Sequence, residues 1–210
     1  MSALDAQARA RGLTIAGGFY PNADDAVPKG TQTLLLLAPD GASFWETFTA
    51  SSFFEDGNAD PIDRWSRQTI GRWACDLGAK ALFPFGGPPY HPFHSWALRS
   101  KRAFTSPVGF LVHADQGLMI SFRGALALKE KVTLPDVASA PCEACAAPCT
   151  TACPVSALTT NGYDVGRCKS YLTDKPACLS QGCAVRRACP VSQSFDRPDI
   201  QSAFHMKAFL

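Results

Sequence analysis

The chain has 210 residues, of which 46% are hydrophobic and 18% are charged, with a formal net charge of +2. These values fit a globular protein with one core, or one core and a small added module, and exclude a strongly basic nucleic-acid-binding protein. No apolar run approaches the length of a membrane span, and the first twelve residues lack the apolar stretch of a secretory signal. We therefore expect a cytoplasmic protein that binds neither nucleic acid nor membrane.

Local patterns predict several elements before residue 95. We expect a helix over 3–11, a strand over 13–20, a buried strand over 31–40, a helix over 44–54, a helix from Asp60-Pro61, a short strand over 81–85 and a loop over 85–94. Ser43 and Glu46 have the spacing of a capping box before the second of these helices. The third helix carries an apolar stripe made of Ile62, Trp65, Ile70, Trp73, Ala74 and Leu77.

Residues 108–128 alternate between apolar and polar on both sides of the turn-like sequence HADQG, at 113–117. That alternation predicts two strands joined as a hairpin. Together with the earlier elements, it indicates an α+β domain with a largely antiparallel sheet. We expect this domain to occupy residues 1–137.

Cysteine is the unusual feature of the composition. Nine are present, and eight of them fall between residues 142 and 189. In a reducing cytosol such a cluster favours metal binding over disulfides. We expect a cysteine-rich module at 138–195, followed by a tail helix at 196–210 docked on the body of the protein. Cys75, the ninth, is interpreted as a small buried apolar residue of the third helix.

The spacing of the eight cysteines favours iron–sulfur clusters. The first motif is Cys142-x2-Cys145-x3-Cys149-x3-Cys153-Pro154, and the letters ACPVS at 152–156 return at 188–192. In the two-cluster ferredoxin pattern the cysteine before proline ligates the other cluster. By that logic one [4Fe–4S] cluster is held by Cys142, Cys145, Cys149 and Cys189. The other is held by Cys153, Cys168, Cys178 and Cys183.

Three alternatives stay open at this point. The first motif has one residue more between its second and third cysteines than the ferredoxin pattern, and the later cysteines are widely spaced. A single cluster on the first motif is therefore one alternative. Zinc and disulfides are the others, although zinc sites usually pair two C-x2-C knuckles and only one is present.

Two segments resemble known families. The first cysteine motif, followed by Arg167-Cys168-Lys169-Ser170-Tyr171-Leu172-Thr173, is similar to the carboxy-terminal ferredoxin region of epoxyqueuosine reductase. The first part of the chain resembles the CblC-type cobalamin-processing enzyme, in TLLLLAP (33–39), in the helix start at Asp60-Pro61 and in residues 109–137. No residue matches the general acid of epoxyqueuosine reductase, so we assign no catalytic residue.

The resemblance implies a flavin-reductase-like α+β fold, a nitroreductase-like half, joined to a small 2[4Fe–4S] ferredoxin-like module. It implies two [4Fe–4S] clusters that deliver single electrons to cobalamin or a flavin. The candidate residues for that second cofactor are Tyr90, His91, His113, Gly117, Phe122, Arg123 and Gly124. We expect a cobalamin-dependent or cobalamin-processing oxidoreductase supplied by a redox donor protein or reductase. The alternative is a ferredoxin-type electron carrier without a bound corrinoid.

Overall fold

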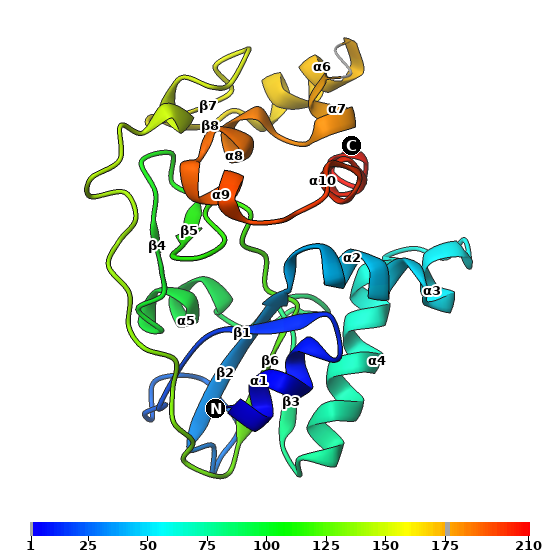
Figure 1. Cartoon of the computed structure of the whole chain (residues 1–210), viewed down its shortest axis with the longest axis vertical. Helices are drawn as coiled ribbons and strands as arrows, with labels where there is room; N and C mark the ends of the chain where they lie inside the picture. Colours follow the sequence, from blue (N-terminus) through cyan, green and yellow to red (C-terminus); the bar gives the residue numbers. More distant parts are fainter. Residues whose placement is uncertain (1, 175–176) are drawn as a thin grey trace. The chain divides into compact units, whose positions relative to one another are not determined.

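The computed structural model describes residues 2–174 and 177–210, and the chain divides into two compact units (Figure 1). Unit 1 consists of Met1–Arg102 and Ser121–Ala138, and unit 2 consists of Ala103–Ile120 and Ser139–Leu210. The expected start of the cysteine-rich module, residue 138, coincides with the last residue of unit 1. The segment Ala103–Ile120, which we expected in the first domain, lies in unit 2.

Unit 1 is built on a four-stranded antiparallel sheet with the strand order β1-β2-β6-β3. Its strands are β1 (Leu13–Phe19), β2 (Thr33–Pro39), β3 (Lys80–Leu82) and β6 (Gly124–Leu128). Its helices are α1 (Ser2–Arg9), α2 (Gly41–Thr49), α3 (Ser52–Glu55), α4 (Pro61–Asp76) and α5 (Phe93–Arg99). The β1, β2 and α4 predictions are confirmed to within two residues at each end.

The core of unit 1 forms where β2 is covered on both faces. All seven residues of β2 are buried, which explains why this strand reads as a continuous apolar run rather than an alternating one. Helix α4 buries the predicted stripe except Leu77, which lies just past its end. The indole Nε1 of Trp73 donates a hydrogen bond to the Gln7 side chain at 2.8 Å, which ties α4 to α1.

Three local predictions for unit 1 are wrong. Helix α2 begins at Gly41, so Ser43 lies inside its first turn and donates a hydrogen bond to the Asp40 carbonyl instead of capping the helix. The predicted helix over 44–54 is broken into α2 and α3. Cys75 is exposed, because it follows Trp73 and Ala74 around the helix onto the solvent side. Helix α5 was not expected.

The predicted hairpin over 108–128 does not form. β5 (Leu111–His113) pairs with β4 (Ala103–Thr105), whereas β6 pairs with β2 and β3. A single bridge, between His113 and Gly117, is what remains across the HADQG turn. The chain passes from unit 2 to unit 1 between Ile120 and Ser121, so the two strands of the expected hairpin belong to different units.

Unit 2 combines short strands with short helices. Its elements are β4, β5, the 3-10 helix η1 (Pro148–Thr150), the pair β7 (Leu158–Thr159) and β8 (Gly162–Tyr163), and the helices α6 (Val165–Asp174), α7 (Ala177–Gln181), α8 (Ala184–Ala188), α9 (Pro190–Ser194) and α10 (Asp199–Lys207). Its core contains Val108, Val112, Leu118, Leu158 and Val185 together with Cys149 and Cys189. Cysteines thus form part of the core itself.

The carboxy-terminal helix is present as α10. The contacts described for it are with α7, inside unit 2, whereas the sequence placed it on the first part of the chain. Taken together, the two units confirm an α+β fold with antiparallel sheets. Within residues 2–174 and 177–210, no helix combines the length and the apolar character needed to cross a bilayer.

Candidate metal centre

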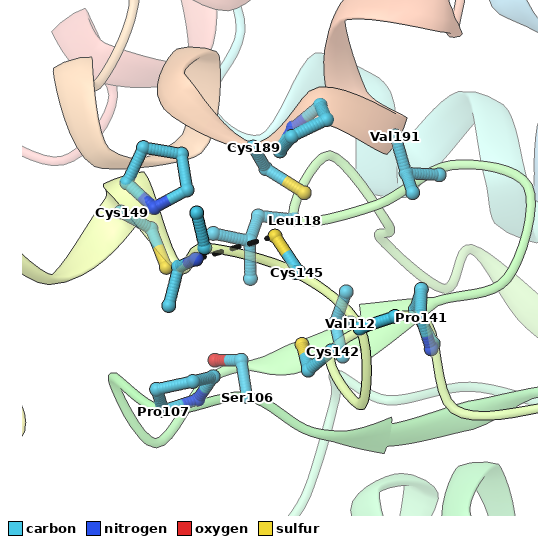
Figure 2. Close-up of a pocket in the computed structure, with 15 residues that line it drawn as sticks. Ser106, Pro107, Val112, Leu118, Pro141, Cys142, Cys145, Cys149, Cys189 and Val191 are labelled. Atoms are coloured by element: carbon cyan, nitrogen blue, oxygen red, sulfur yellow. Dashed lines mark hydrogen bonds between the residues drawn. The ribbon is translucent and has the colours of Figure 1, made fainter.

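A cavity of about 360 Å³ lies within unit 2, and four cysteines face it (Figure 2). These four, which we call the first thiol set, are Cys142, Cys145, Cys149 and Cys189. The rest of the wall is made of small and apolar residues and one serine: Ser106, Pro107, Val112, Leu118, Pro141, Ala144, Ala146, Ala147, Pro148, Pro190 and Val191. The structure therefore brings together the four cysteines that the repeat in the sequence assigned to one cluster.

Local structure explains how residues 47 positions apart reach one cavity. Cys142 and Cys145 lie in and just after the turn that follows Pro141, and Cys149 is the central residue of η1. Cys189 stands at the junction of two helices, as the C-cap of α8 and the N-cap of α9. Pro190 occupies the first position of α9, where its missing N–H costs nothing, so the Cys-Pro pair sets the helix boundary and the place of the thiol.

The thiols of this set interact electrostatically. Burial raises the pKa of Cys142, and Cys145, Cys149 and Cys189 raise it further. Burial also raises the pKa of Cys149, with Cys189 the next cause. Four thiolates facing one cavity would repel one another, so the deprotonated set needs a cation among the sulfur atoms.

Backbone groups approach the sulfur atoms closely. The amide of Ala147 donates a hydrogen bond to Cys145 Sγ at 3.4 Å, drawn in Figure 2, and the amide of Ala157 donates one to Cys153 Sγ at 3.2 Å. Gly117 has a φ of +56°, and a Cβ placed on it would lie 3.0 Å from Cys189 Sγ. A glycine at position 117 thus leaves the Cys189 sulfur uncrowded.

Within the described residues, no three His, Cys, Asp or Glu side chains converge closely enough to hold a single metal ion. All nine cysteines are free thiols, so none is in a disulfide. The first thiol set is instead distributed around a cavity. A [4Fe–4S] cluster suits that distribution, because each thiolate binds a different iron of the cube.

The other four cysteines, the second thiol set, are Cys153, Cys168, Cys178 and Cys183. Cys183 and Cys153 both raise the pKa of Cys178, after the larger effect of its burial. The remaining member, Cys168, lies near Tyr163. Burial raises the Tyr163 pKa most, Cys168 raises it next, and Cys183 also contributes to the rise. Cys153 and Cys183 thus lie near Cys178, and Cys168 and Cys183 lie near Tyr163.

Two arginines, Arg186 and Arg187, lie near these groups. Arg186 donates a hydrogen bond from its guanidinium to the carbonyl of Leu118, and its Cζ lies 4.9 Å from the centroid of the Phe110 ring. Burial lowers the Arg186 pKa, while Cys183 and Tyr163 raise it. This guanidinium is therefore built into unit 2, next to the second thiol set. Arg187 donates a hydrogen bond to the Gly182 carbonyl at 3.4 Å, and its charge lowers the Cys178 pKa.

The seven candidate residues for a second cofactor are divided between the units. In unit 2, His113 is 1% exposed, and its Nδ1 accepts a hydrogen bond from the Asp115 amide at 3.1 Å. A neutral imidazole with an accepting Nδ1 carries its proton on Nε2. Gly117 lies against Cys189 and Ser192, next to a cysteine of the first thiol set, but does not itself line the cavity.

Three of the candidate residues pack at the start of β6 in unit 1, namely Phe122, Arg123 and Gly124. Arg123 forms an ion pair with Asp63 at 3.1 Å, and burial raises the Asp63 pKa against the effect of that charge. Gly124 begins β6, where a Cβ would lie 2.9 Å from Ile70 Cδ1. Phe122 packs on Phe93, with 6.3 Å between ring centroids. These contacts are those of a packed interior.

The loop residues of the same group differ from each other. Tyr90 is 66% exposed, and no ring contact is described for it. His91 stacks on Trp96 of α5, with 5.5 Å between ring centroids. The structure therefore shows a local packing role for His91 and a free aromatic surface at Tyr90.

Residues of the β4–β5 segment were missed as part of the site. Ser106, Pro107, Val112 and Leu118 line the cavity, although they precede the first cysteine of the motif by at least 24 positions. Tyr163 and its place beside Cys168 were also missed. The Ser-Pro pair at 106–107 and the Asn-Gly pair at 161–162 signal turns, but a turn alone does not indicate that it faces a thiol set.

Comparison with known proteins found no match: no protein-family model, no curated protein and no solved structure is similar to this chain at a significant level.

Proposed function

We propose that this chain is an iron–sulfur redox protein that binds two [4Fe–4S] clusters in unit 2 and delivers single electrons to a corrinoid or flavin bound by unit 1. The cavity walled by the first thiol set carries the proposal. A site of that kind offers one thiolate to each iron of a cube. The second cluster rests on the cysteine spacing in the sequence, with Cys153 and Cys183 near Cys178 and with Cys168 near Tyr163.

At the first cavity the protein would hold the cluster, balance the charge of its iron atoms and surround it with apolar side chains. The cysteines supply four thiolates, and iron binding would displace their protons. The wall of alanine, proline, valine and leucine gives the sulfur atoms a largely apolar surrounding, in which Cys149 and Cys189 are buried and Cys142 and Cys145 are partly exposed. The Ala147 amide offers a hydrogen bond to Cys145 Sγ, a contact of the kind that tunes cluster potentials. A bound [4Fe–4S] cluster supplies one-electron chemistry, taking one electron from a donor and passing one to an acceptor.

The proposal of a corrinoid or flavin acceptor rests on the resemblance of the first part of the chain to cobalamin-processing enzymes. The α+β fold of unit 1 is compatible with that resemblance. Cobalamin and flavins both accept single electrons. The donor would be a redox protein or reductase. If unit 1 binds neither cofactor, the chain is an electron carrier of the ferredoxin type, and that is the second candidate function.

Metal analysis of anaerobically purified protein tests the main proposal. We expect brown protein with about eight iron and eight sulfide per chain, as two cubes require. The Cys75→Ala variant serves as a control, because Cys75 is an exposed thiol of unit 1, and its iron content should equal that of the wild type. Colourless protein with stoichiometric zinc, or with disulfides, would refute the redox function.

Binding of the acceptor is tested separately. Cobalamin or a flavin is titrated into the iron-loaded protein, and the visible spectrum of the added cofactor is followed. A saturable spectral shift, followed by reduction of the bound cofactor when dithionite is the electron source, supports the oxidoreductase. No binding of either cofactor to protein with full iron leaves the electron carrier.

A further inference from the structure

One polar side chain in the wall of the first cavity has no partner. Ser106 lies at the turn between β4 and β5, and its side chain lines the cavity together with the first thiol set (Figure 2). The residue is 6% exposed. Among the residues that the structure describes, none forms a hydrogen bond with its Oγ.

The backbone of Ser106 is fully engaged, which fixes the position of the hydroxyl. Its amide donates to the Phe110 carbonyl at 2.8 Å, and its carbonyl accepts from the Gly109 amide at 2.9 Å. Both bonds close the turn that joins β4 to β5. Pro107 follows directly and restricts the backbone of Ser106 to extended conformations. The hydroxyl is thus held on a rigid turn rather than on a mobile loop.

A buried hydroxyl without a partner is unfavourable, because its lost hydrogen bonds to water are not replaced. Native proteins rarely leave such groups unpaired unless a water, ion or ligand completes them. The other side chains around this cavity are hydrocarbon or thiol. An occupant of the cavity can supply the missing acceptor, and in the proposed function that occupant is rich in sulfur.

We propose that the Ser106 hydroxyl donates a hydrogen bond to a sulfur atom of the cluster bound by the first thiol set, and thereby raises the reduction potential of that cluster. This inference rests on the proposed function. Reduction adds one negative charge to the cluster, so a fixed donor stabilises the reduced state more than the oxidised state. Ser106 is a positioning residue that tunes potential, and it is not a ligand.

The test is a redox titration of the iron-loaded protein followed by electron paramagnetic resonance. In Ser106→Ala we expect one of the two cluster signals to titrate at a lower potential. The expected change is about three- to tenfold in the ratio of reduced to oxidised cluster at a fixed potential, where tenfold corresponds to about 59 mV for one electron. The cluster of the second thiol set is the internal reference, and its potential should not move.

A matched pair of variants covers the case in which the alanine variant loses iron. Ser106→Thr and Ser106→Val have the same shape and differ in the hydroxyl, so the threonine variant should keep the higher potential. Ser121→Ala, which removes a buried unpartnered hydroxyl of unit 1, controls for general effects. Equal potentials in the threonine and valine variants, with full iron in both, overturn this inference and leave the proposed function intact. Wild-type protein without iron overturns both.

Discussion

The backbone of Gly117 lies directly against Cys189: a Cβ at Gly117 would stand 3.0 Å from the Cys189 sulfur and 2.4 Å from the amide nitrogen of Ser192. The second contact is the more restrictive, because a backbone atom cannot rotate away. The Ser192 hydroxyl also accepts a hydrogen bond from the Leu118 amide at 2.8 Å. The HADQG turn is thereby fastened to the Cys-Pro junction that carries the fourth thiol of the first set.

Replacing Gly117 with alanine should therefore damage the first cavity. The left-handed φ of +56° alone costs an L-residue about 1–2 kcal/mol, and the collision with Ser192 adds to that. We expect a lower melting temperature and a loss of about half of the iron, from the cluster that includes Cys189. Thermal unfolding and iron analysis measure the two effects.

Gly109→Ala is the matched control. Gly109 also has a left-handed φ, of +78°, and belongs to the same unit, but nothing lies within 4 Å of the added Cβ. This variant should show the backbone strain without the loss of iron. Equal iron loss in both variants would contradict a specific role for the contact between Gly117 and Cys189.

The crossed assignment of ligands predicts different outcomes for the two Cys-Pro cysteines. Cys189 faces the cavity of the first thiol set, whereas Cys153 raises the pKa of Cys178, a member of the second set. Cys189→Ala should abolish the first cluster and Cys153→Ala the second, each lowering the iron content from about eight to about four per chain. Paramagnetic resonance spectra of the two variants should then show complementary signals. Identical spectra from the two variants would refute the crossing.

The sequence predicts the elements of unit 1 where the signal is local. Helix α4 follows from Asp60-Pro61 and its apolar stripe, and β2 follows from its apolar run, because both patterns depend on neighbouring residues. The partner of β6 could not be predicted in the same way. Alternation shows that the residues after the HADQG turn, up to 128, suit a strand. It does not show whether this strand pairs with the preceding strand or with β2.

The candidate site shows the same limit. The repeat of ACPVS carries enough information to group Cys189 with the first motif, because the repeat indicates a duplicated half-site. No sequence pattern around Ser106 indicates a role at the site. Its role depends on burial and on the absence of a partner in the described structure, both of which arise only when the β4–β5 segment folds into unit 2.

Arg186 should raise the potential of the second cluster. Its charge lies near Cys183, and a fixed positive charge favours the more negative, reduced state of a cluster. Arg186→Met keeps much of the side-chain volume and removes the charge, so we expect the second cluster to titrate at a lower potential. The variant also leaves the Leu118 carbonyl without its guanidinium donor, which should lower stability by about 1.5–3 kcal/mol.

Arg167→Met is the control for Arg186→Met. Arg167 is exposed, and its partner Asp164 is 3.6 Å away on the surface, so solvent screens its charge. Its removal should leave both cluster potentials and the melting temperature close to those of the wild type. A shift of equal size in the two variants would mean that net charge, rather than the position of Arg186, sets the potential.

The ion pair between Arg123 and Asp63 predicts a pH-dependent loss of stability. Burial raises the Asp63 pKa above its ordinary 3.8, and Arg123 opposes this rise. The folded state therefore binds the Asp63 proton more tightly than the unfolded state does, so stability falls as the pH rises from 3.8 through the raised pKa and is constant above it. Without Arg123 the Asp63 pKa rises further, so the fall in stability continues to a higher pH.

Arg123→Met should thus lower the free energy of unfolding by about 1–3 kcal/mol near pH 7. The loss is smaller than for a fully buried pair, because Asp63 is one-third exposed. It should shrink toward pH 5. Thermal unfolding between pH 5 and 8 measures this dependence. In the double variant with Asp63→Asn, the group that titrates is gone, so the cost should be the same at every pH. Arg9→Met removes the exposed pair with Asp40 and should have little effect, because solvent screens that pair. A cost for Arg123→Met that is independent of pH would show that the guanidinium acts by packing on Phe85 rather than by its charge.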